Sequence, residues 1–245
     1  MRQPSVPLAS SLEPEGSSHS RGTALEPAGF VDDLERELLR SLARLGEQAR
    51  VAMSPSVPVT DLLAAALRDE IETAEIAALW LTDEPDLDLR LGFARQVGDE
   101  ARHFEMIAER IRELGADPTA DPRTRAHSPV FRYLRGLQTP AERLAAGLVR
   151  EAVARLKNAL LAQVCEARGD TGTARVCRDE VGPDEVRHLE FCRKELPRYA
   201  LTLTDQEAAR RAVARTLQLA EEATDPSRTA KATSAPPADP SPGGR

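Results

Sequence analysis

The chain has 245 residues, enough for one sizeable domain with a buried core. Charged residues make up 30% of it and aromatic residues 3%, and the formal net charge of −7 argues against nucleic acid or an anionic membrane as a partner. No apolar run approaches the roughly 20 residues that span a bilayer, and no secretion signal opens the chain, so we expect a cytoplasmic protein. The three cysteines, Cys165, Cys177 and Cys192, form no C-x-x-C pair and are interpreted as buried thiols.

Both ends of the chain are rich in small and polar residues. Residues 1–28 and 225–245 hold too few apolar side chains to offset the entropy of ordering them, so both are predicted to be disordered. Between them, residues 29–224 have apolar residues at helical spacing almost throughout. One all-helical domain is therefore predicted.

The expected helices follow one another along this domain. A leading helix near 31–47 precedes a Pro-containing connector, after which Thr60 or Asp61 is placed to cap the next helix. The remaining helices are expected near 61–82, 87–114, 140–168, 171–196 and 205–222. The last of them is predicted to open with Thr204-x-x-Glu207, the pattern of a capping box.

The lengths of the connections predict how the four central helices pair. The breaks around 83–85 and 169–170 are short, which makes each pair an antiparallel hairpin. The middle connection, from about 115 to 139, is long enough to span the roughly 30 Å length of a 20-residue helix. Residues 61–196 are thus predicted to form a four-helix bundle of two antiparallel hairpins with a long crossover, with an extra helix at each end.

One seven-residue pattern occurs twice, 85 residues apart (185 − 100). Asp-Glu-Ala-Arg-His-Phe-Glu at 99–105 and Asp-Glu-Val-Arg-His-Leu-Glu at 184–190 agree at five of seven positions. Positions i and i+3 share a helix face, so the Glu and His of each copy can reach the same metal ion. Two such pairs leave a paired-metal site short of two bridging groups, which must come from the other two helices.

Two glutamates interrupt apolar stripes where these bridging groups are needed. Glu70 lies in the stripe of the first bundle helix and Glu151 in that of the third, whereas Glu72 and Glu75 are expected to be solvated charges. The intervals to the following motif are 30 residues (100 − 70) and 34 residues (185 − 151), a difference assigned to a longer turn in the second hairpin. The predicted metal ligands are Glu70, Glu100, His103, Glu151, Glu185 and His188.

This arrangement resembles the oxygen-activating di-iron proteins of the ferritin-like superfamily, in which Glu is followed about thirty residues later by Asp-Glu-x-Arg-His, twice. Bacterial multicomponent monooxygenases and acyl desaturases are among its members. The resemblance covers about residues 61–196. It implies that the six predicted residues hold two iron ions and that each histidine terminates one of them. The chain departs from the family in being short for a monooxygenase catalytic subunit.

The resemblance also implies supporting residues around the ligands. Asp99 and Asp184 would each accept a hydrogen bond from the histidine of the opposite copy, and Arg102 and Arg187 would buttress them. Such partners fix the tautomer of an imidazole ligand and raise its basicity.

Pro183 stands one residue before the second motif, where the first copy has Gly98. Proline inside a helix loosens the hydrogen-bond ladder and kinks it. The kink either opens coordination space beside Glu185 or has no consequence. His127, in the crossover, is interpreted as a loop histidine.

The ligand set has oxygen and nitrogen donors and no thiolate, so two iron ions are expected, with manganese or a mixed pair open. The predicted function is a di-iron oxidase or oxygenase that uses dioxygen to oxidise a small organic substrate by hydroxylation, desaturation or N-oxygenation. No catalytic side chain is expected beyond the metal site. Expected partners are the substrate, dioxygen, a separate electron donor and a second copy of the chain, with no nucleic acid and no membrane.

Three alternative functions stay open. The first is peroxide or iron detoxification, as in rubrerythrin-like and ferritin-like proteins. The second is a tRNA hydroxylase, which shares the Glu-Ala-Arg-His-Phe character of the first motif, although the net charge of −7 counts against an RNA substrate. The third is a non-catalytic helical bundle that holds metal structurally or binds a partner protein.

Overall fold

The structure is a computed structural model that describes residues 23–120 and 127–225, and every regular element in these ranges is helical. Residues 1–22 and 226–245, most of the two ends predicted to be disordered, lie outside the described residues. The α-helices are α1 Pro27–Ala52, α2 Val59–Asp83, α3 Leu87–Glu113, α4 Pro129–Leu134, α5 Pro140–Ala167, α6 Thr171–Arg175, α7 Gly182–Glu195 and α8 Leu203–Thr224. None of the described helices is long and apolar enough to cross a membrane.

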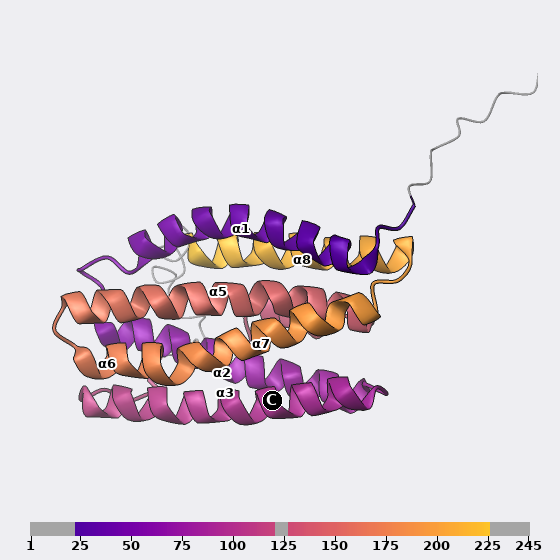
Figure 1. The fold of residues 1–245 in the computed structure, drawn as a ribbon. Helices are drawn as coiled ribbons and strands as arrows, with labels where there is room; N and C mark the ends of the chain where they lie inside the picture. Colours follow the sequence, from indigo (N-terminus) through magenta and orange to yellow (C-terminus); the bar gives the residue numbers. More distant parts are fainter. Residues whose placement is uncertain (1–22, 121–126, 226–245) are drawn as a thin grey trace, which may run out of the picture.

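The central bundle consists of two antiparallel hairpins, α2 with α3 and α5 with α6 and α7 (Figure 1). Gly115 after α3 and Gly169 after α5 have φ values of +81° and +78°, the left-handed conformation that commonly ends a helix and that glycine adopts without strain. The end of α3 and the start of α5 lie at opposite ends of the bundle, so the connection between them runs along its length (Figure 1). The predicted all-helical fold class, with a long crossover and extra terminal helices, is confirmed.

The leading helix is longer than the predicted 31–47 at both ends. Pro27 occupies the first turn, where its missing N–H costs nothing, and the Glu26 carboxylate accepts a hydrogen bond from the Gly29 N–H. Phe30, fully buried, fixes this end of α1 to the core. α1 and α8 lie side by side and pack against α5 (Figure 1).

Two predicted caps differ in the structure. α2 starts at Val59, and its N-cap residue Pro58 makes no side-chain bond, so neither Thr60 nor Asp61 caps the helix. α8 starts two residues earlier than expected, with a capping box between Thr202 and Asp205. The sequence contains two overlapping Thr-x-x-acid patterns there, and the pattern alone does not choose between them.

The two hairpins have turns of equal length, residues 84–86 and 168–170. The predicted longer turn in the second hairpin is therefore wrong, and the difference lies in the helices. Glu151 stands 16 residues before the end of α5, whereas Glu70 stands 13 before the end of α2. The second motif also lies one residue further from the turn of its hairpin than the first motif does. The π-helical turn Val176–Val181 accommodates this one extra residue within the helical segment.

This π-helical turn adjoins Pro183. The Gly182 N–H donates to the carbonyl of Cys177, five residues back, and Pro183 itself has no N–H to donate. The widened turn ends at Val181, with Gly182 and Pro183 between it and Asp184. The predicted helix over 171–196 is thus interrupted, and the predicted distortion at the proline is present.

Two hydrophobic clusters lie on either side of the middle of the bundle. One contains Trp80, Phe93 and Leu144, and the other contains Leu67 and Ile107. The three cysteines are buried free thiols, as expected. The polar residues between the two clusters form the candidate site.

Candidate metal centre

All six predicted ligands are buried in the middle of the bundle, although they come from four helices. Of the six, α2 and α5 each contribute one glutamate, and α3 and α7 each contribute one Glu-x-x-His pair. Their exposed fractions are Glu70 4%, Glu100 1%, His103 0%, Glu151 2%, Glu185 1% and His188 6%. Four carboxylates removed from water in this way are costly unless positive charge compensates them.

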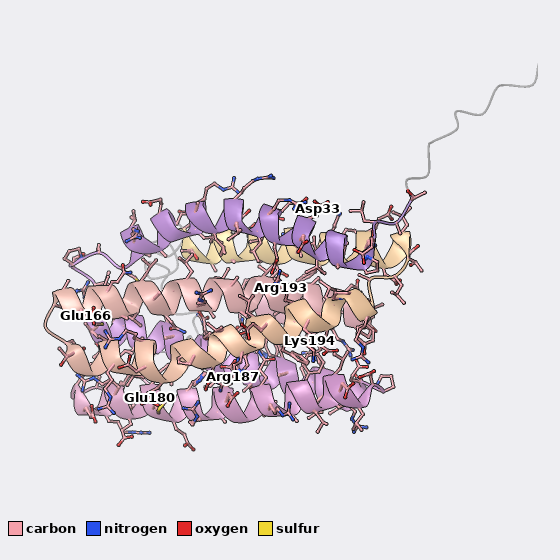
Figure 2. The ribbon with its side chains drawn as sticks, in the orientation of Figure 1. Asp33, Glu166, Glu180, Arg187, Arg193 and Lys194 are labelled. Carbon is pink, nitrogen blue, oxygen red and sulfur yellow. The ribbon has the colours of Figure 1, made fainter. Side chains whose placement is uncertain are left out.

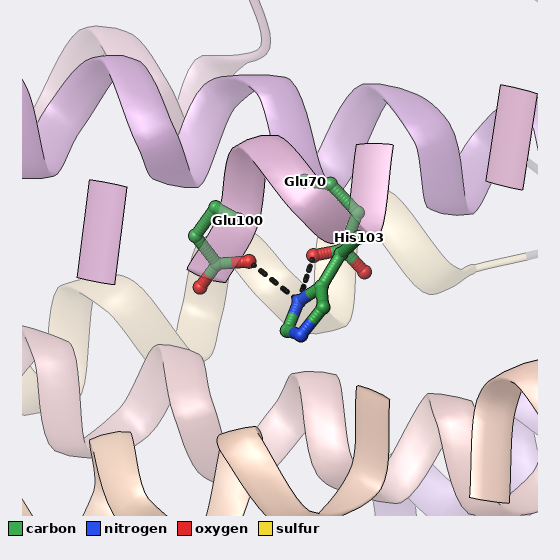
Figure 3. A group of neighbouring side chains, drawn as sticks. All are labelled: Glu70, Glu100 and His103. Atoms are coloured by element: carbon green, nitrogen blue, oxygen red, sulfur yellow. Dashed lines mark hydrogen bonds and ion pairs between the residues drawn. The ribbon is translucent and has the colours of Figure 1, made fainter. Parts of the chain in front are cut away.

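The first group of potential ligands joins α2 and α3. His103 Nδ1 lies 3.2 Å from Glu100 Oε2 and 3.4 Å from Glu70 Oε2 (Figure 3). One atom from each of these residues lies within 4.8 Å of the other two. One cation can reach all three at this spacing.

The second group joins α3, α5 and α7. His188 Nδ1 lies 3.2 Å from Glu100 Oε1 and 3.5 Å from Glu151 Oε2, and these three residues also offer atoms within 4.8 Å of one another. The centroids of the His103 and His188 rings are 6.4 Å apart. Glu100 belongs to both groups, with one oxygen toward each histidine, so it stands where a bridging ligand would stand. Glu70 and Glu151, the expected bridging groups, each belong to one group only, which differs from the prediction.

Glu185 belongs to neither group. Its Oε1 accepts a hydrogen bond from Asn158 Nδ2 at 3.2 Å, while its buried Oε2 has no hydrogen-bond partner. His188 Nδ1, although near two carboxylates, also makes no hydrogen bond. A buried oxygen and a buried nitrogen without partners cost free energy that a bound cation would recover. The residues present therefore fit a pair of metal ions.

The far side of each imidazole contacts an aspartate from the other hairpin. His103 Nε2 lies 3.0 Å from Asp184 Oδ2, and His188 Nε2 lies 3.1 Å from Asp99 Oδ2. An N–H on Nε2 that donates to the aspartate leaves Nδ1, on the side of the carboxylates, as the atom that would bind metal. The structure thus places the two aspartates in the crosswise arrangement that the resemblance implies.

The two predicted arginines are not arranged symmetrically. Arg102 pairs with Asp184, and Arg187, at the surface of α7 (Figure 2), also pairs with Asp184 while lying 3.8 Å from Asp99. The Asp184 side chain is 4% exposed and that of Asp99 is 27% exposed. Asp184 is therefore more buried than Asp99 and pairs with both arginines.

Burial and hydrogen bonding change the proton affinity of the whole centre. Burial raises the pKa of Glu70 to about 8, and burial together with neighbouring carboxylates raises the pKa of Glu185 well above its usual range. Burial alone would lower the pKa of the imidazoles, but the neighbouring carboxylates of Glu100 and a second glutamate raise it to about 10 for His103 and about 11 for His188. Burial works to raise the pKa of Glu100, but the two histidines hold it below its usual range.

Two buried amides at the site were not predicted. Gln96 Nε2 donates to Glu151 Oε1 at 2.8 Å, and Asn158 donates to Glu185. Gln96 lies four residues before Glu100, and Asn158 lies seven after Glu151, so both are on the ligand-bearing faces of their helices. This spacing is the signal that could have identified them.

Glu72 is buried, so its predicted solvation is wrong. It is 2% exposed, and its two oxygens accept hydrogen bonds from the N–H of Ser128, at 2.6 Å, and from the Ser128 hydroxyl, at 2.5 Å. The crossover therefore covers a second face of α2. Glu75 is exposed, as expected, and lies 2.9 Å from His127 Nε2.

Comparison with known proteins agrees with this architecture. The family model of the ferritin-like domain matches residues 76–202, just over half of the chain and including both copies of the motif. No curated protein and no solved structure matches the chain. With its two hairpins, its crossover and this match, the chain belongs to the ferritin-like family.

Proposed function

We propose that this protein is a di-iron oxidoreductase that uses dioxygen to oxidise a small organic substrate by hydroxylation, desaturation or N-oxygenation. The observation that supports it is the pair of buried Glu/His groups that share Glu100, each with a histidine held by an aspartate of the opposite hairpin. Oxygen and nitrogen donors favour iron, with manganese or a mixed pair as the alternatives. Bound as a reduced pair, the metals would supply electrons and binding positions for dioxygen.

The residues of the chain have separate tasks in this proposal. Glu70, Glu100, Glu151 and Glu185 bring four negative charges, which balance two divalent cations. Asp99 and Asp184 hold the outer N–H of each imidazole, so that the inner nitrogen stays free to bind metal. The hydrophobic clusters on both sides surround these charges with apolar side chains, which strengthens the electrostatic interactions among them.

A cavity beside the centre favours an organic substrate over iron storage or peroxide removal. Its volume is about 530 Å³, and Glu70 and Asn158 are among its lining residues. Cavities of roughly 300–1,000 Å³ accommodate drug-sized ligands. Neither storage of iron nor reduction of peroxide needs such a volume next to a ligand.

The proposal includes partners outside the chain. Each of the three reactions consumes two electrons beyond those that the substrate supplies. Hydroxylation and N-oxygenation place one oxygen atom in the product and one in water, and desaturation reduces both atoms to water, so we propose a separate electron donor. The cytoplasm is the proposed compartment. The homodimer expected from the sequence stays a prediction.

The test begins with anaerobic loading of the full chain with ferrous iron. Elemental analysis should give about two ions per chain, and less than about half an ion per chain would contradict the proposed site. Dioxygen uptake should then depend on an added organic substrate. Uptake of dioxygen or peroxide that no organic compound stimulates would favour detoxification instead.

A matched pair of variants on α2 tests whether Glu70 is a metal ligand. Glu70→Ala should lose metal and dioxygen uptake, because it removes a buried ligand. Glu75→Ala, on the exposed face of the same helix, should retain both. Equal loss in the two variants would show that the register assigned to α2 is wrong.

A further inference from the structure

The cavity beside Glu70 lies between α2 and α5 and is bordered by the C-terminal parts of α1 and α8 and by Ser128 and Val130. α2 and α5 belong to different hairpins, and the terminal helices complete the wall that the four-helix bundle lacks. Much of the lining consists of small apolar side chains, Ala49, Ala52, Ala65, Ala66, Ala154 and Ala220. Side chains this short leave room for the apolar body of a ligand.

Three cations line the same cavity near the metal centre. Lys157 Nζ lies 3.0 Å from Asp69 Oδ2, and a terminal nitrogen of Arg68 lies 4.0 Å from Asp69 Oδ1. Arg150 donates through Nε to Thr73 Oγ1 at 2.8 Å and through a terminal nitrogen to the carbonyl oxygen of Asp69. Both partners of Arg150 are uncharged groups, and no carboxylate of the described chain lies within 4.0 Å of its guanidinium.

The positive charge in this part of the cavity exceeds the negative charge. Lys157 and Arg68 both lie beside the Asp69 carboxylate, and Arg150 contacts the backbone carbonyl of the same residue, so one carboxylate faces three cations. Asp61, the other acid beside them, is exposed at the rim, and Glu70 belongs to the metal centre. Arg68 Nε is buried and has no hydrogen-bond partner. A ligand group that accepts hydrogen bonds and carries negative charge would pair with Arg68 Nε and offset the excess positive charge on this side of the cavity.

We infer that the cavity binds a small amphipathic anion, with its apolar body among the alanines and its carboxylate or phosphate on Arg150 and its neighbouring cations. Glu70 lines the same cavity, and Arg150 contacts Thr73, three residues along α2 from Glu70, so an anion held there lies beside the metal centre. The inference rests on the proposed function for the claim that this ligand is the molecule oxidised, but not for its binding.

The test measures binding by calorimetry to the full chain as purified, with octanoate, octyl phosphate, octanol and octylammonium as probes. At least one of the two anions should bind about tenfold more tightly than octanol, the usual effect of a charge-assisted hydrogen bond. The tighter of the two anions identifies the anionic group. Octanol that binds as tightly as both anions, or octylammonium that binds more tightly than both, would overturn the inference.

Variants on α5 separate the charge from the fold. Arg150→Gln should weaken binding of the anion about tenfold and leave octanol within about twofold, because only one charge-assisted contact is removed. Lys157→Gln should act in the same direction and serves as the test if Arg150→Gln does not fold. Arg155→Gln, exposed on the same helix, is the control. Anion binding that the cavity variants and the control affect equally would place the anion elsewhere.

A third variant tests the cavity itself. Ala66→Phe should abolish binding of both anion and alcohol, whereas Ala94→Phe, on the exposed face of α3, should abolish neither. Iron content and dioxygen uptake are measured on the same preparations. Retained anion binding in a protein that takes up no iron would refute the proposed function alone, and full iron loading without anion binding would refute this inference alone.

Discussion

Metal binding at this centre should displace about four protons at pH 7, since a neutral exchange requires four singly charged protons to leave when two divalent ions enter. Glu70, with a pKa of about 8, holds a proton at pH 7 in the metal-free protein, and burial with neighbouring carboxylates raises the pKa of Glu185 well above its usual range, which favours its protonated form. His103 and His188, with pKa values of about 10 and 11, carry a second proton each. Each of these four groups must lose one proton before it can bind metal.

The magnitude follows from the number of protons. One proton released per binding event changes the binding free energy by about 1.4 kcal/mol per pH unit, so four change it by about 5.5 kcal/mol for the metal pair. Protons compete with metal, so affinity should rise with pH. The increase of affinity with pH should become less steep above pH 8, where Glu70 is mostly ionised before metal binds.

Calorimetry with manganous ion, in buffers of different ionisation enthalpy at one pH, gives the number of protons directly. Glu185→Gln should release about one proton fewer, because the amide has none to give. Glu105→Gln, exposed in the first copy of the motif, should release the same number as the unmodified protein. Release of one proton or none, or an unchanged number in the Glu185 variant, would refute the reasoning.

Three further predictions concern the surroundings of the centre. Asp184→Asn should weaken metal affinity roughly ten- to a hundredfold in a chelator competition, while the exposed Asp179→Asn should not; equal affinities would show that Asp184 does not support its histidine. Glu72→Ala should lower the free energy of unfolding in urea by about 1–3 kcal/mol, because Ser128 loses both acceptors, with metal content unchanged. An effect below about 0.5 kcal/mol, as at ordinary surface sites, would contradict that expectation. The metal-free protein should lose stability as pH rises, most steeply from 6.5 to 8, because its buried imidazoles and Glu70 hold protons that the unfolded chain has already released. A urea midpoint that does not fall across this interval would contradict the raised pKa values.

The helices were predictable because their apolar spacing and their glycine breaks are local properties. The stripe that contains Glu70 faces α3, and spacing along one helix was enough to find it. Glu72 was misjudged because α2 has a second buried face, which exists only when the distant Ser128 folds over it. Periodicity in one segment carries no information about such a contact.

The site was predictable to the extent that it is duplicated. Two copies of one motif identify Glu100, His103 and their counterparts, and the crosswise aspartates came with the resemblance to a known family. Gln96 and Asn158 do not follow the repeat. The position that corresponds to Gln96 in the second half is Val181 (96 + 85), which cannot donate a side-chain hydrogen bond. Reasoning from the repeat alone therefore passes over them. The cavity results from the packing of α1, α2, α5 and α8 against one another, which the sequence of any one helix does not predict.

The crosswise bonds from aspartate to histidine also constrain how the two halves can change over evolutionary time. A substitution at Asp99 alters the environment of His188, and one at Asp184 alters that of His103. Neither hairpin carries both the histidine and the aspartate that orients it. The two copies are therefore expected to drift together rather than independently, and a hairpin transplanted from a relative would bring a histidine whose partner it left behind.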